Sequence, residues 1–343
     1  MSTNNRHVPT VCILALPESS GAVLYGLFEV LSMFSKQWAQ ITGNNDYPAE
    51  FDVKIVAASR EAFTCVGGVP VAPHASYEEI RQTDVVIVTD LAIDPESNHR
   101  HRWAESGVWL QSMHETGSLI CSVCSGSVLL AASGLLDGRQ ATTHWAYIDH
   151  FQKFYPQVKL EPSRILVAES EQSGIVTMGG MSAWEDLALY LIARFYGEAS
   201  AVKAAKLFLF GDRSEGQLLF TAICKPKRHE DKEIAKSQQW ISEHYDSPNP
   251  VQVMAKKSGL TERTYKRRFK QATGYTPIDY VQTLRVEEAK QLLESSAAAI
   301  DIIAQQVGYE DPTSFRRLFK RLTGVTPGRY RQRFQSIKTG LVH

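Results

Sequence analysis

The sequence lacks long apolar runs and is poor in cysteine, and both deficits limit what the protein can be. Its 343 residues contain no stretch of about 18 apolar residues, so we expect no membrane span. The first ten residues lack the apolar core of a signal peptide. Five cysteines, an odd number in a long chain, suggest a reducing compartment. We therefore expect a cytoplasmic protein of two or three domains.

Common cofactor and metal motifs are also missing. No G-x-G-x-x-G follows the first apolar run, and no Walker loop occurs. Cys121 and Cys124 form a C-x-x-C pair, but no second pair completes a zinc site. Because Cys121 falls within a predicted strand, a buried thiol is favoured over a redox pair. We expect neither a cofactor nor a metal ion.

The net charge of zero hides a strong asymmetry between the two ends of the chain. From Lys225 to His343 there are 22 Lys and Arg against 13 Asp and Glu, a net of +9. The preceding residues carry the balancing −9. A basic end on a neutral protein indicates a polyanionic partner for that end, or else only a solvated basic face.

One segment of the basic end occurs twice. The first copy runs from Ala255 to Tyr280 and the second from Ala304 to Tyr330. Gly259 recurs 49 positions later and Gly274 recurs 50 positions later, so the second copy has one extra residue. Each copy predicts a short helix, a turn and a longer basic helix, which is a helix-turn-helix. We expect two recognition helices for double-stranded DNA; the alternative is a protein-binding helical pair.

Apolar spacing within each longer helix indicates which side chains face outward. In the first, Tyr265 and Phe269 are spaced for a core, which leaves outward the basic residues Arg263, Lys266, Arg267 and Lys270. In the second, Phe315 and Phe319 belong to the apolar stripe, and the outward residues are Thr313, Ser314, Arg316, Arg317 and Lys320. Long donors on an exposed helix face are typical of contacts to base edges and phosphates.

The N-terminal part alternates short apolar runs with helical segments. The runs are Val11–Leu16, Phe51–Ala57, Asp84–Asp90 and Leu119–Val123. Strands that alternate with helices predict a parallel sheet covered on both faces. Ligands of such sheets bind beyond the carboxyl ends of the strands.

Cys124 follows the last of these runs, in the small-residue turn SVCSGS. A strand-to-helix turn of this kind can expose a nucleophile at the positive end of a helix, which would lower the thiol pKa. Cys124 is therefore a candidate reactive thiol. The alternative is an ordinary cysteine at a tight turn.

Three segments carry a family resemblance in the first two thirds of the chain: SVCSGSVLLAASGLLDGRQATTHW from Ser122, TMGGMSAWEDLAL from Thr177 and RSEGQLLF from Arg213. They resemble the PfpI/ThiJ superfamily, in particular its isocyanide-hydratase-like branch and the ligand domains of GlxA-type AraC-family regulators. The resemblance implies an α/β flavodoxin-like fold, of the class I glutamine-amidotransferase-like type, that senses a ligand and dimerises.

The C-terminal part resembles an AraC-family DNA-binding domain, through SGLTERTYKRRFKQATGYTP, LRVEEAKQLL and VGYEDPTSFRRLFKRLTGVTP. The expected organisation is a sensing and dimerisation domain over residues 1–224, a linker over 225–233 and an all-α double helix-turn-helix domain over 234–336. This layout implies a transcription regulator that acts as a homodimer on promoter DNA.

One departure from the family pattern argues against catalysis. Enzymes of this branch carry an Asp in a D-L-x-G-P motif, and Val23 stands at that position. A thiol without a positioned carboxylate or base lacks a proton shuttle. We therefore expect no enzyme. The alternatives are a thiol-dependent hydratase or amidase fused to a DNA-binding module, and a redox sensor that uses Cys124.

The residues expected to form the effector site are Cys124, His144, Trp145 and Trp184. Aromatic faces and an imidazole beside a thiol suit a small nitrogen-containing metabolite. Two of these residues have a plainer interpretation. His144 is as readily a structural hydrogen-bonding residue, and Trp184 could simply pack on a helix surface.

Overall fold

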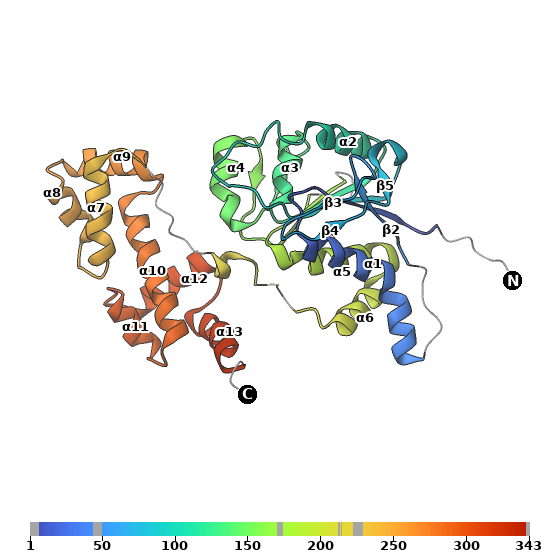
Figure 1. Cartoon of the computed structure of the whole chain (residues 1–343). Helices are drawn as coiled ribbons and strands as arrows, with labels where there is room; N and C mark the ends of the chain where they lie inside the picture. The colour runs from blue at the N-terminus through green and yellow to red at the C-terminus, as the bar shows by residue number, and fades with distance from the viewer. Residues whose placement is uncertain are drawn as a thin grey trace. The chain divides into compact units, whose positions relative to one another are not determined.

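The chain folds as two units that meet in sequence between Gln217 and Leu218 (Figure 1). The structure, a computed structural model, describes residues 7–43, 50–169, 174–211, 213, 215–221 and 229–340, with the side chains of 336–340 excepted. No helix in these ranges is both long and apolar enough to cross a membrane.

The first unit is built on a seven-stranded sheet with the strand order β10-β11-β7-β6-β1-β2-β5. All neighbouring strands are parallel except β10 and β11. The strands are β1 (Thr10–Leu14), β2 (Asp52–Ala57), β5 (Ala75–Ser76), β6 (Val85–Val88), β7 (Leu119–Val123), β10 (Leu166–Ala168) and β11 (Ile175–Met178). The four predicted strands and the mostly parallel sheet are confirmed.

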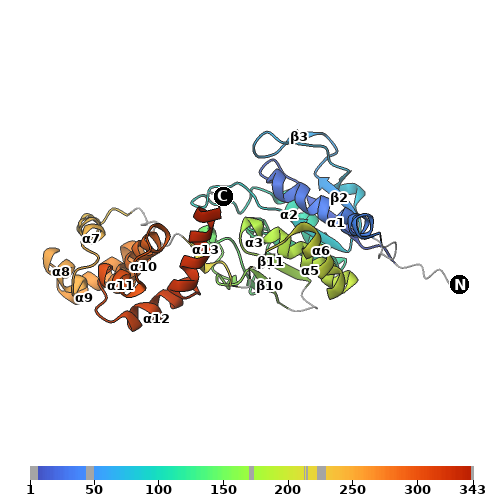
Figure 2. The ribbon, with the colours of Figure 1, turned by 90° about the horizontal axis from the view of Figure 1, so that it is seen from below.

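Helices cover both faces of this sheet (Figures 1 and 2). Successive residues of β1 alternate between two cores, with Val11 and Ile13 in one and Cys12 and Leu14 in the other. The first core packs under α1 (Gly21–Thr42), α5 (Trp184–Tyr196) and α6 (Glu198–Phe208). The second packs under α2 (Ala104–Glu115), α3 (Gly126–Ala132) and α4 (Ile148–Phe154). This is the parallel sheet covered on both faces that the alternation of strands and helices predicts, in the flavodoxin-like form that the family resemblance implies.

Short elements complete the first unit. Two small two-stranded sheets pair β3 (Phe63–Thr64) with β4 (Pro70–Val71) and β8 (Gln140–Ala141) with β9 (Lys159–Leu160). The 3₁₀ helices are η1 (Tyr77–Glu79), η2 (Trp145–Tyr147) and η3 (Met181–Ala183).

The second unit is helical and repeats one packing arrangement. Its helices are α7 (Lys232–Glu243), α8 (Pro250–Lys257), α9 (Glu262–Thr273), α10 (Pro277–Ser295), α11 (Ile300–Gln306), α12 (Pro312–Thr323) and α13 (Pro327–Gly340). The ring of Phe269 lies edge-on against Tyr280 at 5.4 Å between centroids, and Phe319 meets Tyr330 in the same way at 5.5 Å. Both recognition helices, α9 and α12, end at a left-handed glycine.

The two copies differ where their recognition helices begin. Thr261 caps α9 through its hydroxyl, which accepts from the backbone N–H of Thr264. Asp311 caps α12 and accepts from the N–H groups of Thr313 and Ser314, while Pro312 occupies the first helical position. The extra residue of the second copy therefore lies in the turn before α12. The side chain that ends this turn accepts hydrogen bonds from two backbone N–H groups, whereas that of Thr261 accepts from one.

The boundary between the units lies before the predicted one, which followed residue 224. Leu219, in η4 (Leu218–Phe220), is 2% exposed and belongs to the core around α12. Phe220 lies edge-on against Phe334, and the Lys290 ammonium donates to the carbonyl of Thr221 at 2.7 Å. The apolar pair Leu219–Phe220 thus belongs to the helical unit, which composition alone did not reveal.

The predicted linker, residues 225–233, is only partly visible. Residues 225–228 lie outside the described residues. Asp231 caps α7 and its carboxylate pairs with Arg268 of α9 at 2.7 Å. The last part of the predicted linker therefore belongs to the first helix of the helical unit.

We predict that Leu219→Ala destabilises the helical unit by about 2–5 kcal/mol, because it empties a buried site in a packed core. Calorimetric unfolding of the full chain measures the change. Leu209→Ala is the matched control, since Leu209 is 87% exposed. Equal and small effects of the two substitutions would contradict the assignment of Leu219 to this core.

Candidate functional site

A tight turn at the carboxyl end of β7 holds Cys124. Its φ of 56° is in the left-handed region, which non-glycine residues seldom adopt. The backbone N–H of Cys124 donates to Met178 at 2.9 Å, and its carbonyl accepts from the Ser127 hydroxyl at 2.8 Å. A Cβ on Gly126 would overlap the carbonyl oxygen of Thr89. The turn is therefore held rigidly against the end of β6.

The thiol at this turn is buried and protonated at neutral pH. Cys124 is 6% exposed, and burial, with a smaller contribution from the charge of Asp90, raises its pKa to about 12. An activated nucleophile requires the opposite shift. Cys121 is fully buried in β7, and burial raises its thiol pKa as well. The geometry thus gives neither cysteine the properties of a reactive thiol.

The carboxylate whose charge raises the pKa of this thiol belongs to Asp90, a residue that the sequence did not single out. Asp90 follows β6, is 4% exposed and has an Oδ1 atom without a hydrogen-bond partner among the described residues. Burial raises its pKa to about 6. Its charge raises the pKa of Cys124 and contributes to the raised pKa of Cys65 and Tyr147.

A signal for Asp90 was present in the sequence. It is an acidic residue that follows a run of buried strand residues, and parallel strands bring their carboxyl ends to one edge of the sheet. Val23, which stands at the acidic position of the family motif, is fully buried in the apolar core. A buried acidic group at this edge therefore comes from the segment after β6, whereas the α1 position that matches the family motif is apolar.

The loop with His144 and Trp145 lies beside the turn. The Thr143 hydroxyl accepts from Ser127 at 2.8 Å, and Ser127 also binds the carbonyl of Cys124. The His144 Nδ1 accepts from the N–H of Ala146 at 3.1 Å, and its ring lies 4.9 Å from that of Trp145. Burial lowers the pKa of His144. This hydrogen bond matches the structural interpretation of the histidine.

Trp184 occupies a different place, at the start of α5. A Cβ on Gly26 of α1 would lie 2.9 Å from its indole ring. The ring also lies edge-on against Phe210 at 5.6 Å. Glu185 beside it pairs with Arg213 at 2.5 Å. These contacts match the packing interpretation of Trp184. Of the other residues expected to form the effector site, Cys124 lies in the turn, and His144 and Trp145 lie in the loop beside it.

A buried glutamine ties the end of the first unit to this loop. Gln217 is 2% exposed, and its amide nitrogen donates to the carbonyl of Thr143 at 2.7 Å. Its amide oxygen accepts from the N–H of Trp145 at 3.2 Å. A Cβ on Gly179 would overlap the amide group of Gln217, so glycine leaves room for it.

The recognition helices present the predicted outward residues to solvent, with one exception. Exposed on α9 and α12 are Arg263, Lys266, Arg267, Lys270, Thr313, Arg316, Arg317 and Lys320. Ser314 is half-buried, and its hydroxyl donates to the capping Asp311 at 2.6 Å. Ser314 is therefore engaged in starting α12.

Two of the exposed cations are paired with acidic neighbours. Lys266 lies 2.5 Å from Glu262, and Arg316 pairs with Asp301. Exposed pairs of this kind contribute about 0–1 kcal/mol, so a phosphate or a base can replace the carboxylate. No side-chain hydrogen bond or ion pair is found for Arg263, Arg267 or Lys270 within the described residues.

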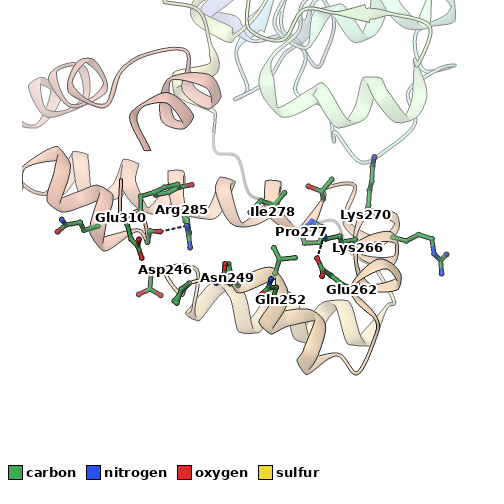
Figure 3. Close-up of a pocket in the computed structure, with 18 residues that line it drawn as sticks. Asp246, Asn249, Gln252, Glu262, Lys266, Lys270, Pro277, Ile278, Arg285 and Glu310 are labelled. Carbon is green, nitrogen blue, oxygen red and sulfur yellow. Dashed lines mark hydrogen bonds and ion pairs between the residues drawn. The ribbon is translucent and has the colours of Figure 1, made fainter. Parts of the chain in front are cut away.

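A groove of about 1230 Å³ lies within the helical unit, between its two halves (Figure 3). Lys266, Arg267 and Lys270 line it from α9, and Ile278 and Arg285 line it from α10. A groove lined by recognition-helix cations can accept a polyanionic strand.

Arg285 joins the two halves at this groove. Its guanidinium donates to the carbonyls of Tyr245 at 2.7 Å and Gly308 at 2.9 Å, and lies 5.0 Å from the centre of the Tyr309 ring. Arg285 was not singled out in the sequence, where it is one more basic residue in a long helix.

Comparison with known proteins agrees with this two-part organisation. The DJ-1/PfpI family model matches residues 11–194, and a helix-turn-helix domain model matches residues 254–333. The HTH-type transcriptional regulator CdhR of Pseudomonas aeruginosa is 30% identical over 228 residues, which are 65% of this chain and 66% of that protein. The match therefore spans just under two thirds of CdhR.

Two further relatives are also named as regulators. GlxA of Rhizobium meliloti is 27% identical over 67% of this chain and 71% of its own length. GbdR of Pseudomonas aeruginosa is 23% identical over 92% of this chain and 84% of its own length. These three relatives thus carry the names of transcription regulators.

We predict that Cys124 reacts slowly with iodoacetamide at pH 8, because less than one part in a thousand of a thiol with a pKa of about 12 is ionised there. Peptide mapping by mass spectrometry, from pH 6 to pH 10, measures the rate at each cysteine. The rate at Cys124 should still be rising at pH 10. A plateau below pH 7 would show an activated thiol and contradict the prediction.

Proposed function

Since the chain belongs to the DJ-1/PfpI family and carries an AraC-type helix-turn-helix domain behind the family domain, we propose that it regulates transcription by binding promoter DNA under the control of a small effector. The observation that carries the proposal is the pair of repeated helices, α9 and α12. Their apolar faces are buried in matching aromatic cores, and their basic faces are exposed.

The exposed cations divide into two proposed roles. Arg263, Lys266 and Arg267 on α9, together with Arg316 and Arg317 on α12, read base edges, with Thr313 as a further polar contact. Lys270 and Lys320, one turn further along each helix, bind phosphate. Lys266 and Arg316 exchange their carboxylate partners for DNA. The loss of these ion pairs reduces the net contribution of the two side chains to the free energy of DNA binding.

We propose that the α/β unit is a sensor without catalytic activity. Cys124 is neutral, and its neighbour His144 is engaged as a cap acceptor. A hydratase or an amidase of this kind needs a thiolate, and the raised pKa of Cys124 does not support one. The effector is a small nitrogen-containing molecule that binds beside Cys124, with His144 and Trp145 in the adjoining loop.

Effector binding controls DNA binding only if the two conformations of the protein bind the effector with different affinity. We propose that the signal passes through the segment from Gln217 to Thr221. Gln217 is anchored in the loop beside Cys124, whereas Leu219 is anchored in the core of the second helix-turn-helix. Only one residue separates these two anchors.

The active form is proposed to be a cytoplasmic homodimer. By family resemblance the α/β units pair, so that two subunits read two DNA half-sites. Two half-sites multiply the base contacts available for discrimination.

We predict that Arg267→Ala and Arg317→Ala each relax base preference at a few adjacent positions of the operator. A bidentate arginine–guanine contact contributes about 1–3 kcal/mol of discrimination. Lys270→Ala is the matched comparison and should weaken binding to all sequences alike. Binding-site selection followed by sequencing measures both effects. Unchanged selection profiles for both arginine variants would refute the assignment of base-reading residues.

We predict that a four-residue Gly-Ser insertion after Gln217 uncouples the units. Operator affinity measured in vitro should be retained, because α9 and α12 are untouched. A promoter reporter should vary with nitrogen source for the native protein and stay constant for the insertion variant, since the flexible segment no longer transmits a displacement. An equal response of both proteins would exclude this route.

A further inference from the structure

Asp90 is a buried carboxylate without a cationic partner among the described residues. It is 4% exposed, and within the part of the chain that the structure describes its Oδ1 atom accepts no hydrogen bond and it forms no ion pair with Lys, Arg or His. Removing a carboxylate from water costs several kcal/mol unless other groups compensate. Buried polar atoms of folded proteins nearly always have partners, so an orphan at the edge of a sheet points to a missing one.

The groups around Asp90 cannot fill this role. The titratable side chains that its charge affects are Cys65 beside β3, Cys124 at the turn and Tyr147 in η2. The hydroxyl of Tyr147 already donates to the carbonyl of Ile93 at 2.7 Å. The hydroxyl of Thr89 likewise donates to Ser19 at 2.9 Å. All these groups are neutral and none supplies a positive charge.

The position of Asp90 matches the place where ligands of open parallel sheets bind. It lies beyond the carboxyl end of β6, next to the turn beyond β7. A Cβ on Gly126 would overlap the backbone of Val88 and Thr89 at the end of β6, so the carboxylate and the thiol are held at the same edge. The loop with His144 and Trp145 adjoins them through Ser127.

We propose that Asp90 recognises the effector, and that its free Oδ1 accepts a hydrogen bond from a protonated primary or secondary amine. The inference rests on the sensing function proposed above and specifies its ligand class. An ammonium group brings both the charge and the N–H donor that the site lacks. A quaternary ammonium ion brings the charge alone and leaves the acceptor unpaired.

Thermal unfolding of the full chain tests the ligand class. The probes are methylammonium, ethanolamine and 1,4-diaminobutane as chlorides, each against tetramethylammonium chloride at equal ionic strength. At least one amine should raise the Tm of the native protein, since a ligand that binds the folded state stabilises it. Tetramethylammonium should not. The proposal is overturned if no amine raises the Tm of the native protein, or if tetramethylammonium raises it as much as the amines do.

Asp90→Asn should lose the amine response. Asp84→Asn, at the opposite end of β6, is the matched control, because Asp84 already accepts hydrogen bonds from the backbone N–H and hydroxyl of Thr10 and from His7. The control should keep the response. An amine response that survives in Asp90→Asn removes Asp90 from the site.

The stability of the ligand-free variants separates recognition from a structural role. In the folded protein the pKa of Asp90 is about 6, above its ordinary value of 3.8. Ionisation of Asp90 therefore lowers the stability of the fold as pH rises from about 4 through 6. Below about pH 4 the carboxyl group is protonated and this loss is absent. Asp90→Asn should therefore raise the Tm by several degrees at pH 8 and change it little at pH 4. Asp84→Asn should lower it at pH 8. A lower Tm for Asp90→Asn at pH 8 would show a structural carboxylate and refute the proposal.

The outcomes distinguish this proposal from the function on which it rests. If neutral or anionic metabolites raise the Tm of the native protein and of Asp90→Asn equally, sensing stands and the role of Asp90 falls. If the arginine variants of α9 and α12 leave DNA selection unchanged, the DNA-binding assignment fails whatever the amine result.

Discussion

The close approach of Gly126 to the backbone after β6 determines the chemistry of the first unit. No side chain fits there, so the turn beyond β7 lies directly on the end of the neighbouring strand. This contact brings Cys124 and Asp90 to one sheet edge in a buried environment. The low polarity raises both pKa values, which keeps the thiol neutral and leaves the carboxylate in need of a donor.

The helical unit depends on a second repeated constraint. In each half an aromatic pair from the recognition helix packs against the tyrosine of the next helix, Tyr280 or Tyr330. That packing fixes which face of α9 and α12 is exposed. Arg285 then holds the halves together through backbone carbonyls on both sides. The basic faces are thus consequences of apolar packing, and the cations need few contacts of their own.

The two units share a chain segment that is short and anchored at both ends. Gln217 is held by the loop beside Cys124, and Leu219 is held by the second aromatic core. If this segment carries the effector signal, the effector must bind two conformations of the protein with different affinity. The sensing loop, the connection and the recognition helix therefore form one proposed path.

The sequence alone determined the strands, the duplicated helices and the outward face of each recognition helix, because these follow from local periodicity. The family motifs also located Cys124. Only the tertiary structure decided that Asp90 is an unpaired neighbour of that thiol, that Trp184 packs against α1, and that Leu219 belongs to the helical unit. These facts depend on contacts between residues distant in the sequence and on burial, which sets the charge state of a carboxylate or a thiol and has no local pattern.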